Sequence, residues 1–274
     1  MTKTVFIVVA NHKGGCGKTT TVINLAAEFG RAGLNAVVVD LDPQANASMH
    51  ISDIHPSEVT ATAAEVLSRD DVSVAAALIE KTMFEGVSLI FGSLRLNSAE
   101  EDLRDAPRPA EVLKYKLRAL DGIADVVIFD TPPSLKLLTS NAIAAATHLI
   151  VPVESGSQYG MYGMADLLRH VERIRQINPE LVTLGALLTR HDERLNVCKL
   201  MSQQALESVG KLMETRISSS TAVPKSSINR KSVHGEDRSS KVAREFRALA
   251  EEIAAKTGIK LKKAAPRKSV KARA

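Results

Sequence analysis

The chain has 274 residues, of which 45% are hydrophobic and 24% charged, a composition typical of a globular protein with one large or two modest domains. No apolar run approaches the ~20 residues that span a bilayer, so we expect neither a membrane span nor a signal peptide. Aromatic residues make up only 3%, with no Trp, which argues against recognition of nucleic acid by base stacking.

The formal net charge of +5 is unevenly distributed. Residues 225–274 hold 15 Lys and Arg against 5 Asp and Glu, whereas residues 1–224 hold 21 against 26. A slightly acidic body with a basic C-terminal fifth predicts a polyanionic partner, either nucleic acid or an anionic membrane. The two cysteines, Cys16 and Cys198, are too few for a disulfide framework or a four-ligand metal site, which favours a reducing cytoplasm.

Nearly continuous apolar runs alternate with helical patterns along the chain. We predict strands at residues 5–10, 36–41, 87–91, 126–130, 148–153 and 181–188. We predict helices at residues 19–33, 109–121, 139–146, 161–178, 197–211 and 239–256, and a Ser/Thr-rich loop at residues 218–227. Uninterrupted apolar strands are typical of sheets covered on both faces, so the pattern predicts a doubly wound α/β fold with a mostly parallel sheet. We expect one domain over residues 1–257 and a flexible basic tail over residues 258–274, because the tail has too few apolar residues to fold alone.

A glycine- and lysine-rich segment joins the first strand to the first helix. It reads Lys13-Gly14-Gly15-Cys16-Gly17-Lys18-Thr19-Thr20. The usual phosphate-binding loop has a glycine where His12 stands, so the match is to the variant K-G-G-x-G-K-[ST], which carries an additional lysine. Glycines allow successive N–H groups to point at phosphate oxygens, and the following helix N-terminus favours negative charge. Lys18 should then reach the β- and γ-phosphates and the Thr19 hydroxyl should bind Mg²⁺, while Cys16 fills the unspecified position.

Acidic residues follow two of the predicted strands. Asp130 ends a buried strand, at the position where nucleoside triphosphatases hold Mg²⁺ indirectly. Asp40 and Asp42 follow the second strand, and strand alternation places both on one side. Ligands of such folds bind at the carboxyl ends of the strands, so one of these two carboxylates can position an attacking water.

At these residues the chain resembles the ParA/MinD family of deviant-Walker ATPases, on the ParA side. The resemblance covers almost the whole chain. Besides the phosphate-binding loop it includes residues 40–46, residues 130–134, Val151-Pro152-Val153 and the closing helical segment at residues 238–253. No helix-turn-helix precedes residue 5, so the chain resembles the short form of the family.

The resemblance implies a role for each matching residue. Lys13 would reach across an ATP-bound homodimer to the partner's phosphates, and Asp42 would orient the hydrolytic water. Thr19, Asp40 and Asp130 would form the Mg²⁺ site. Residues 13–20 together with Pro152 would contact ATP, and the segment from residue 130 to residue 139 would respond to the γ-phosphate.

The resemblance also implies partners and location. The ATP-bound dimer would bind double-stranded DNA non-specifically on the nucleoid, in the cytoplasm, and would be released when a ParB-like partner stimulates slow hydrolysis. The candidate DNA contacts are basic residues in the C-terminal third of the chain, namely Arg194, Arg216, Lys225, Arg230 and Lys231.

Three alternatives share the phosphate-binding loop. A MinD-like membrane-cycling ATPase needs an amphipathic C-terminal helix, but the tail offers only Ile259, Leu261 and Val270 as large apolar groups, interrupted by Pro266. An electron-transfer protein of the iron-protein type needs two suitably placed cysteines per subunit. A small-molecule kinase or ligase needs an acceptor site, for which the sequence shows no distinct motif. The sequence therefore favours DNA over membrane as the partner.

Overall fold

A computed structural model describes residues 3–261, so residues 262–274 of the predicted basic tail lie outside the described part. Its centre is a seven-stranded sheet in the order β3-β4-β2-β5-β1-β6-β7. Every neighbouring pair is parallel except β3 with β4. The strands are β1 (Val5–Val9), β2 (Ala36–Asp40), β3 (Leu78–Ile79), β4 (Val87–Ile90), β5 (Val126–Asp130), β6 (His148–Glu154) and β7 (Val182–Thr189).

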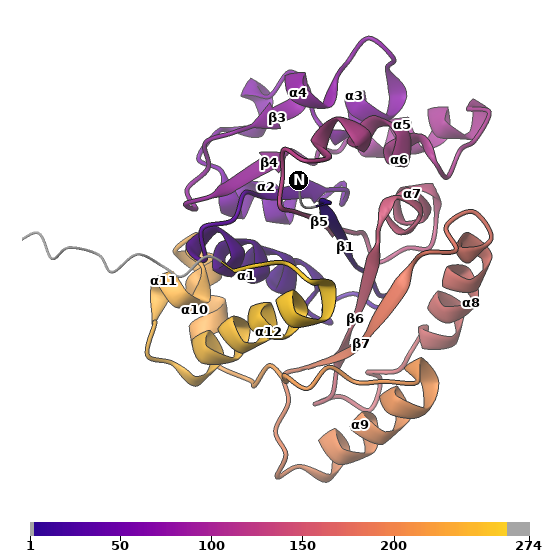
Figure 1. Cartoon of the computed structure of the whole chain (residues 1–274). Helices are drawn as coiled ribbons and strands as arrows, with labels where there is room; N and C mark the ends of the chain where they lie inside the picture. Colours follow the sequence, from indigo (N-terminus) through magenta and orange to yellow (C-terminus); the bar gives the residue numbers. More distant parts are fainter. Residues whose placement is uncertain (1–2, 262–274) are drawn as a thin grey trace, which may run out of the picture.

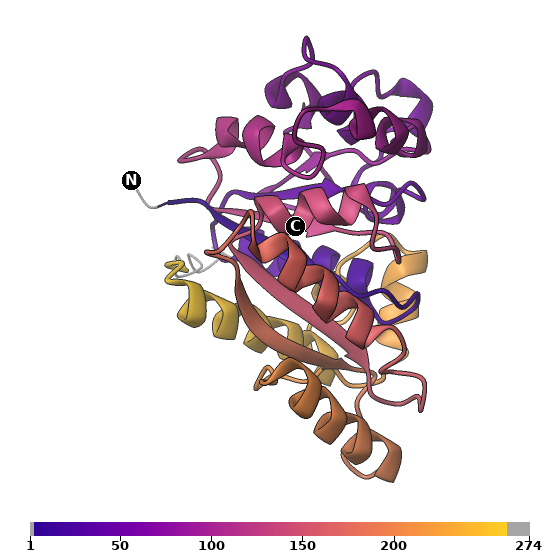
Figure 2. The same ribbon diagram turned by 90° about the vertical axis from the view of Figure 1, so that its right-hand side faces the viewer.

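Helices cover both faces of this sheet (Figure 1 and Figure 2). They are α1 (Lys18–Arg31), α2 (Asn46–Ile51), α3 (Ala63–Ser68), α4 (Val74–Ala77), α5 (Leu96–Asp102), α6 (Val112–Lys116), α7 (Leu137–Ala145), α8 (Met164–Arg175), α9 (Asn196–Val209), α10 (Ala222–Ile228), α11 (Val233–Glu236) and α12 (Lys241–Thr257). The predicted doubly wound α/β fold is confirmed.

The apolar runs form continuous strands because each strand is buried on both faces. In β1, Val8 packs into the core beneath α3 and α5–α8, whereas Val9 packs into the core beneath α1, α2 and α12. Successive strand residues point to opposite faces, so both positions must be apolar. The two cores hold the sheet between two helical layers.

The connection order places a crevice at the end of β1. The chain moves from β1 outward to β2 and β4, returns to β5 beside β1, and then continues on the other side of β1 with β6 and β7. Ligands of open α/β sheets bind at such a switch point, outside the carboxyl ends of the strands. The glycine-rich loop follows β1 and therefore lies at this point.

Two predicted elements differ from the structure. Residues 218–227, predicted as a loop, contain most of α10, which forms because Ala222 and Ser226 are buried one helical turn apart. Pro224 lies in its first turn, where a missing N–H costs nothing. The helix predicted at residues 109–121 is shorter, because α6 gives way to a 3-10 helix at Leu117–Leu120 that ends before Gly122 (φ 75°).

The C-terminal helix ends one residue beyond its predicted end at residue 256. α12 ends at Thr257 and is followed by Gly258 in the left-handed conformation, with a φ of 77°. Beyond it, within the described part of the chain, Ile259 and Leu261 are partly buried against the core beneath α1 and α12. Within residues 3–261, no helix is both long enough and apolar enough to cross a bilayer.

The close contact between α1 and the start of β4 generates a prediction. A Cβ atom added at Gly30 would lie 2.1 Å from the Glu85 carbonyl oxygen, which forces the backbones apart. We expect Gly30→Ala to lower the free energy of unfolding by roughly 1–3 kcal/mol, although alanine is the better helix former. Urea unfolding measures this change. Gly235→Ala, where the nearest atom would be 3.3 Å away, is the control, and equal stability of the two variants would contradict the close-packing argument.

Candidate functional site: a phosphate-binding loop facing two buried carboxylates

The glycine-rich loop presents free backbone N–H groups to the end of the sheet. Gly15 (φ 76°) and Gly17 (φ 91°) adopt the left-handed conformation, which glycine reaches without steric cost. Gly17 is the N-cap of α1, and no side chain caps the helix there. The first N–H groups of α1 therefore remain available, and the helix dipole adds positive potential to them.

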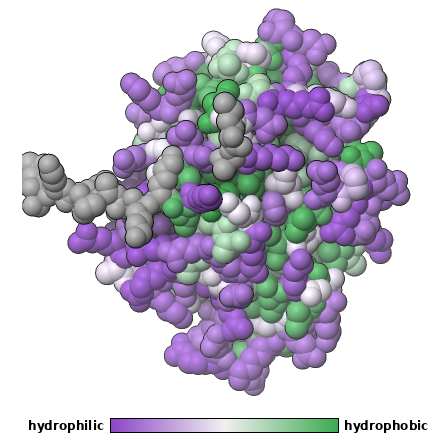
Figure 3. Space-filling view, in the orientation of Figure 1, coloured by the Kyte–Doolittle hydropathy of each residue, from purple (hydrophilic) through white to green (hydrophobic). Residues whose placement is uncertain are grey.

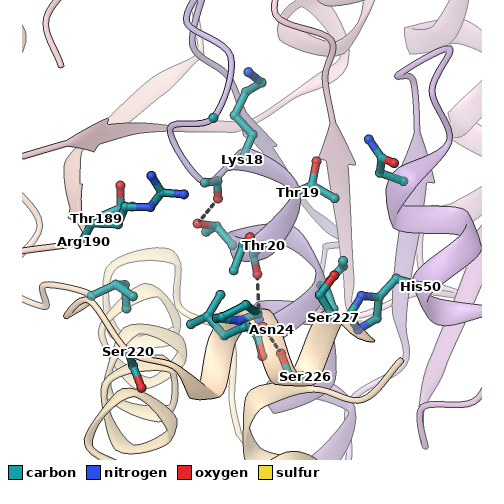
Figure 4. A pocket seen from close by; sticks show the side chains of 18 of the residues that line it. Lys18, Thr19, Thr20, Asn24, His50, Thr189, Arg190, Ser220, Ser226 and Ser227 are labelled. Atoms are coloured by element: carbon teal, nitrogen blue, oxygen red, sulfur yellow. Dashed lines mark hydrogen bonds between the residues drawn. The ribbon is translucent and has the colours of Figure 1, made fainter. Parts of the chain in front are cut away.

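A cavity of about 1280 Å³ opens at this helix N-terminus. One end is lined by Gly14, Gly15 and Gly17 with Lys18, Thr19 and Thr20, and the lining continues with Thr189, Arg190 and residues 218–221 (Figure 4). Asp42, Gln44 and Pro133 complete the side nearest the strand ends. The cavity is large enough for a nucleotide lying along α1 with its phosphates over the loop.

Lys18 is positioned by its own loop. Its side chain is buried, and Nζ donates a hydrogen bond to the Lys13 carbonyl oxygen at 2.9 Å. The ammonium group is thereby held over the loop. Thr189, at the end of β7, supports the loop from the other side, because its hydroxyl donates to the Cys16 carbonyl oxygen at 2.9 Å.

Asp40 and Asp130 form the acidic floor of the site. They end the adjacent parallel strands β2 and β5, are paired in register and are fully buried. Burial raises the pKa of Asp40 to about 6, although its hydrogen bonds with Ser48 and the Asp42 backbone N–H favour the charged form. Burial also raises the pKa of Asp130 well above its usual value, and the neighbouring Asp40 charge adds to the rise.

The carboxylate of Asp130 is set up for a cation. Neither oxygen has a hydrogen-bond partner among the described residues, while the nearby Thr19 and Lys18 side chains favour its charged form. In residues 3–261 no three His, Cys, Asp or Glu side chains are grouped so that they could hold a metal by themselves. Mg²⁺ is usually bound through one or two carboxylates together with phosphate oxygens and waters, so this set fits Mg²⁺ that arrives with a nucleotide.

Of the two acids after β2, Asp42 is the one that faces the cavity. Its Oδ1 atom accepts a hydrogen bond from the Gln44 N–H at 2.9 Å, which fixes the loop between β2 and α2. Asp40 is instead occupied by the backbone N–H and hydroxyl of Ser48. Asp42 therefore presents its carboxylate at the cavity, and Asp40 organises the loop behind it.

Lys13 forms an ion pair with Glu154 of the same chain, which the sequence did not predict. Its Nζ atom is 2.7 Å from Glu154 Oε2, and Arg190 Nη1 is 2.7 Å from Glu154 Oε1. Both positive charges lower the pKa of Glu154. Glu154 is the last residue of β6 and Arg190 directly follows β7, so the rule that ligand-binding side chains lie at the carboxyl ends of strands was the signal that could have found them.

Two further predicted contacts lie behind the cavity wall. Pro152 is inside β6 and does not line the cavity; its carbonyl oxygen accepts from Asn11 Nδ2 at 2.6 Å and so holds the start of the loop. The Cys16 thiol is buried, donates to the Lys13 carbonyl oxygen at 3.2 Å, and has its pKa raised by burial. A protonated, buried thiol is consistent with a filler position.

The five candidate DNA contacts fall into two groups. Arg194 and Arg216 lie near the start of α9, where they pair with Asp192 and Glu193 respectively. Lys225, Arg230 and Lys231 lie on α10 and the turn after it, beside the cavity. On the side of the molecule shown in Figure 1, hydrophilic residues cover most of α10–α12, whereas hydrophobic residues gather over β6 and β7 (Figure 3).

Comparisons with known proteins agree with this geometry. The model of a family described as AAA domain matches residues 4–183. The sporulation initiation inhibitor protein Soj of Bacillus subtilis is 33% identical over 256 residues, covering 91% of this chain and 98% of Soj. The chromosome partitioning protein ParA of Myxococcus xanthus is 35% identical over 204 residues, covering 74% of this chain and 69% of that protein.

A solved structure extends the similarity to a nucleotide complex. A Mycobacterium smegmatis protein described as cobyrinic acid a,c-diamide synthase, with bound ADP and magnesium, superposes with a TM-score of 0.80 at 32% identity, covering 96% of this chain and all of that one. Three findings point to the same family. They are the phosphate-binding loop with its additional lysine, the acids at the ends of β2 and β5, and the similarity to Soj over nearly the whole length. The chain belongs to the ParA/MinD family of ATPases, on the ParA/Soj branch.

Proposed function

We propose that this partition ATPase binds double-stranded DNA non-specifically as an ATP-bound homodimer, and that it leaves DNA when a ParB-like partner stimulates hydrolysis. The nucleoid in the cytoplasm is then its expected location. The observation that carries the DNA part is the position of α10. Its inner residues Val223 and Ser226 line the nucleotide cavity, whereas Lys225, on the same helix, is exposed. One short helix thus faces both ligands.

The nucleotide part follows from the site. Loop N–H groups and Lys18 would hold the phosphates, and the Thr19 hydroxyl with Asp130 and Asp40 would hold Mg²⁺. When bound, Mg²⁺ neutralises phosphate charge that develops during transfer. Asp42, at the cavity wall beside Gln44, would orient water for in-line attack on the γ-phosphate.

Dimerisation would require Lys13 to change its partner. In the single chain Lys13 and Glu154 are both mostly buried, with side-chain exposures of 17% and 15%. A second subunit's phosphates carry more negative charge than one carboxylate, so ATP in the partner would compete for this ammonium. Lys13 would then stabilise transition-state charge from the neighbouring subunit. ADP, lacking the γ-phosphate, offers a weaker competitor.

The central experiment measures DNA binding against nucleotide state. We expect random-sequence duplex DNA to shift in gels with ATP and much less with ADP. If Lys225 and Lys231 of each protomer contact phosphates, roughly four contacts per dimer give a slope near −4 in a plot of log affinity against log salt. The Lys225→Ala, Lys231→Ala double variant should flatten that slope, and Arg104→Ala, exposed on the opposite helical layer, is the control.

Other outcomes decide against the proposal. Equal binding with ADP and ATP, or none with either, overturns nucleotide-controlled DNA binding. ATP-dependent sedimentation with anionic liposomes instead of DNA indicates a membrane-cycling ATPase. Hydrolysis that depends on an added organic acid acceptor indicates a ligase, as the description of the Mycobacterium smegmatis relative would suggest.

The Lys13–Glu154 pair gives a prediction about assembly. Glu154→Gln removes the competing carboxylate, so we expect the ATP-dependent dimer to form at a protein concentration about tenfold lower, equivalent to about 1.4 kcal/mol. Lys13→Ala should bind ATP but fail to dimerise. Light scattering with and without ATP measures both. An unchanged dimerisation curve for Glu154→Gln would show that the ion pair does not oppose assembly.

The buried carboxylates give a prediction about pH. Their folded pKa values lie above the unfolded value of about 3.9, so the folded state holds extra protons and nucleotide-free stability falls as pH rises from about 4 through 6. Asp130→Asn should therefore raise the free energy of unfolding at pH 8 by on the order of 1–3 kcal/mol, with little gain at pH 4. The same variant should lose stabilisation by Mg²⁺ and ADP.

Urea unfolding at the two pH values measures this change. The control is Asp121→Asn, an exposed aspartate far from the site, which should leave the pH dependence as in the parent chain. Equal destabilisation of Asp130→Asn at pH 4 and pH 8 would show that the carboxylate charge is not the source of the effect.

A further inference from the structure

The segment between β2 and α2, residues 41–45, carries Asp42 and is called the hydrolysis loop here. The short helix α2 connects this loop to the far side of the nucleotide cavity. Its first residues follow Asp42 and Gln44 directly, and it is anchored on Asp40 through Ser48. The Ser48 N–H and hydroxyl both donate to Asp40 Oδ2, at 2.9 and 2.7 Å, and the Gly92 N–H donates to the Ser48 hydroxyl at 2.8 Å. A displacement of Asp40 would therefore be transmitted to the start of α2.

The other end of α2 is tied to the basic segment, defined here as residues 225–231. His50 Nε2 lies 2.9 Å from the Lys231 carbonyl oxygen. Because a carbonyl only accepts, Nε2 carries the proton and donates. In the opposite direction, the Arg230 guanidinium donates to the Ser52 carbonyl oxygen. We call these two hydrogen bonds the clasp.

The surroundings of His50 keep it in place. Burial lowers the pKa of His50, and the nearby Arg230 charge adds to this, while the hydrogen bond to the Lys231 carbonyl acts in the opposite direction without reversing the net lowering. The ring also meets Phe84 edge to face, with centroids 6.0 Å apart and planes at 77°. Figure 4 shows His50 projecting from α2 toward the side of the cavity that carries Ser227 of α10.

Arg230 occupies a backbone position that arginine does not favour. Its φ is +50°, in the left-handed region where glycine is usual after a helix. For a residue with a Cβ atom this conformation is sterically unfavourable. The arginine side chain contacts the Ser52 carbonyl, a bond that glycine could not make. Arg230 therefore adopts an unfavourable backbone conformation at the position where its side chain makes a long-range hydrogen bond to Ser52.

A second tie joins the basic segment region to the phosphate-binding helix. Asn24, in α1, donates to the Thr20 carbonyl oxygen at 2.8 Å and accepts from the Val233 N–H at 2.7 Å. The start of α11 is thus fixed to α1. The clasp holds the last two residues of the basic segment, and this tie holds Val233 two residues further on. Asn24 and His50, which make the two connections, both line the cavity.

We propose that His50 and Arg230 are positioning residues that make the placement of the basic segment depend on the state of the hydrolysis loop, through α2. The proposal rests on the proposed function. A γ-phosphate with its cation would fix the positions of Asp40 and Asp42. Because Ser48 joins Asp40 to α2, the position of α2 would be fixed as well, and the clasp would then fix the turn that carries Lys231. Arg230 then acts through Ser52, while Lys225 and Lys231 contact the DNA backbone.

The distinguishing measurement is the ratio of DNA affinity with ATP to that with ADP. His50→Ala and Arg230→Ala should each lower this ratio about fivefold or more, the usual lower range of coupling between two sites. His50→Gln, whose side-chain amide can donate to the same carbonyl, should restore it. Lys231→Ala removes a contact and not a tie, so it should weaken binding alike in both nucleotide states.

Reciprocity supplies an independent readout. Whatever factor ATP contributes to DNA affinity, DNA must contribute to ATP affinity. In the clasp variants, added duplex DNA should therefore no longer tighten binding of a non-hydrolysable ATP analogue, whereas it should in the parent chain and in His50→Gln. Hydrogen exchange over residues 225–236 should also lose its ATP-dependent protection in the clasp variants.

The outcomes separate this inference from the proposed function. If the parent chain shows no ATP-dependent DNA binding, the proposed function fails. If the parent discriminates between nucleotides and His50→Ala discriminates equally well, the clasp is overturned. If His50→Ala weakens DNA binding equally with ATP and with ADP, and His50→Gln does not restore binding, His50 has a purely structural role. That result also overturns the coupling through the clasp.

Discussion

Two carboxylates buried side by side, at the ends of adjacent parallel strands, are the constraint on which the site depends. Asp40 and Asp130 are in register, fully buried and disfavoured as a charged pair. The chain relieves Asp40 with hydrogen bonds from Ser48 but gives Asp130 no hydrogen-bond partner within residues 3–261. Because the buried Asp130 carboxylate is unfavourable without a positive partner, binding of a cation beside it is favoured. The facing loop fits a nucleotide, so Mg²⁺ bound to a nucleotide is the expected cation.

The rest of the site follows from where the sheet ends. The glycine-rich loop and the loops after β2, β5, β6 and β7 meet at one edge, so the residues of the site come from separate stretches of chain. Thr189 supports the loop from β7, and Glu154 holds Lys13 from β6. The ion pair between Lys13 and Glu154 gives the single chain a resting position for the lysine, which a second subunit would have to displace.

The wall of the cavity connects the nucleotide site to the basic surface of α10. α10 forms part of that wall, is fixed through α11 to α1, and is held by the clasp to α2. Three of these helices, α1, α2 and α10, contribute residues to the lining of the cavity. Short helices with few buried side chains are the elements that local opening affects first, which suits a segment expected to change position between two nucleotide states.

The parallel α/β architecture, the phosphate-binding loop and the acids at the ends of β2 and β5 could be predicted without a structure. Each depends on a local pattern: apolar runs, glycine spacing or a carboxylate at a strand end. The sequence did not predict β3 or the short helices α2–α5, α10 and α11, and it made α6 too long. For α10 the reason is that burial of Ala222 and Ser226 outweighs the turn-forming character of that segment. Only the tertiary structure joined Lys13 to Glu154, 141 residues away, and His50 to Lys231, 181 residues away. Neither pair leaves a local signal, because the geometry of each is set by strand order and helix packing and not by neighbouring residues.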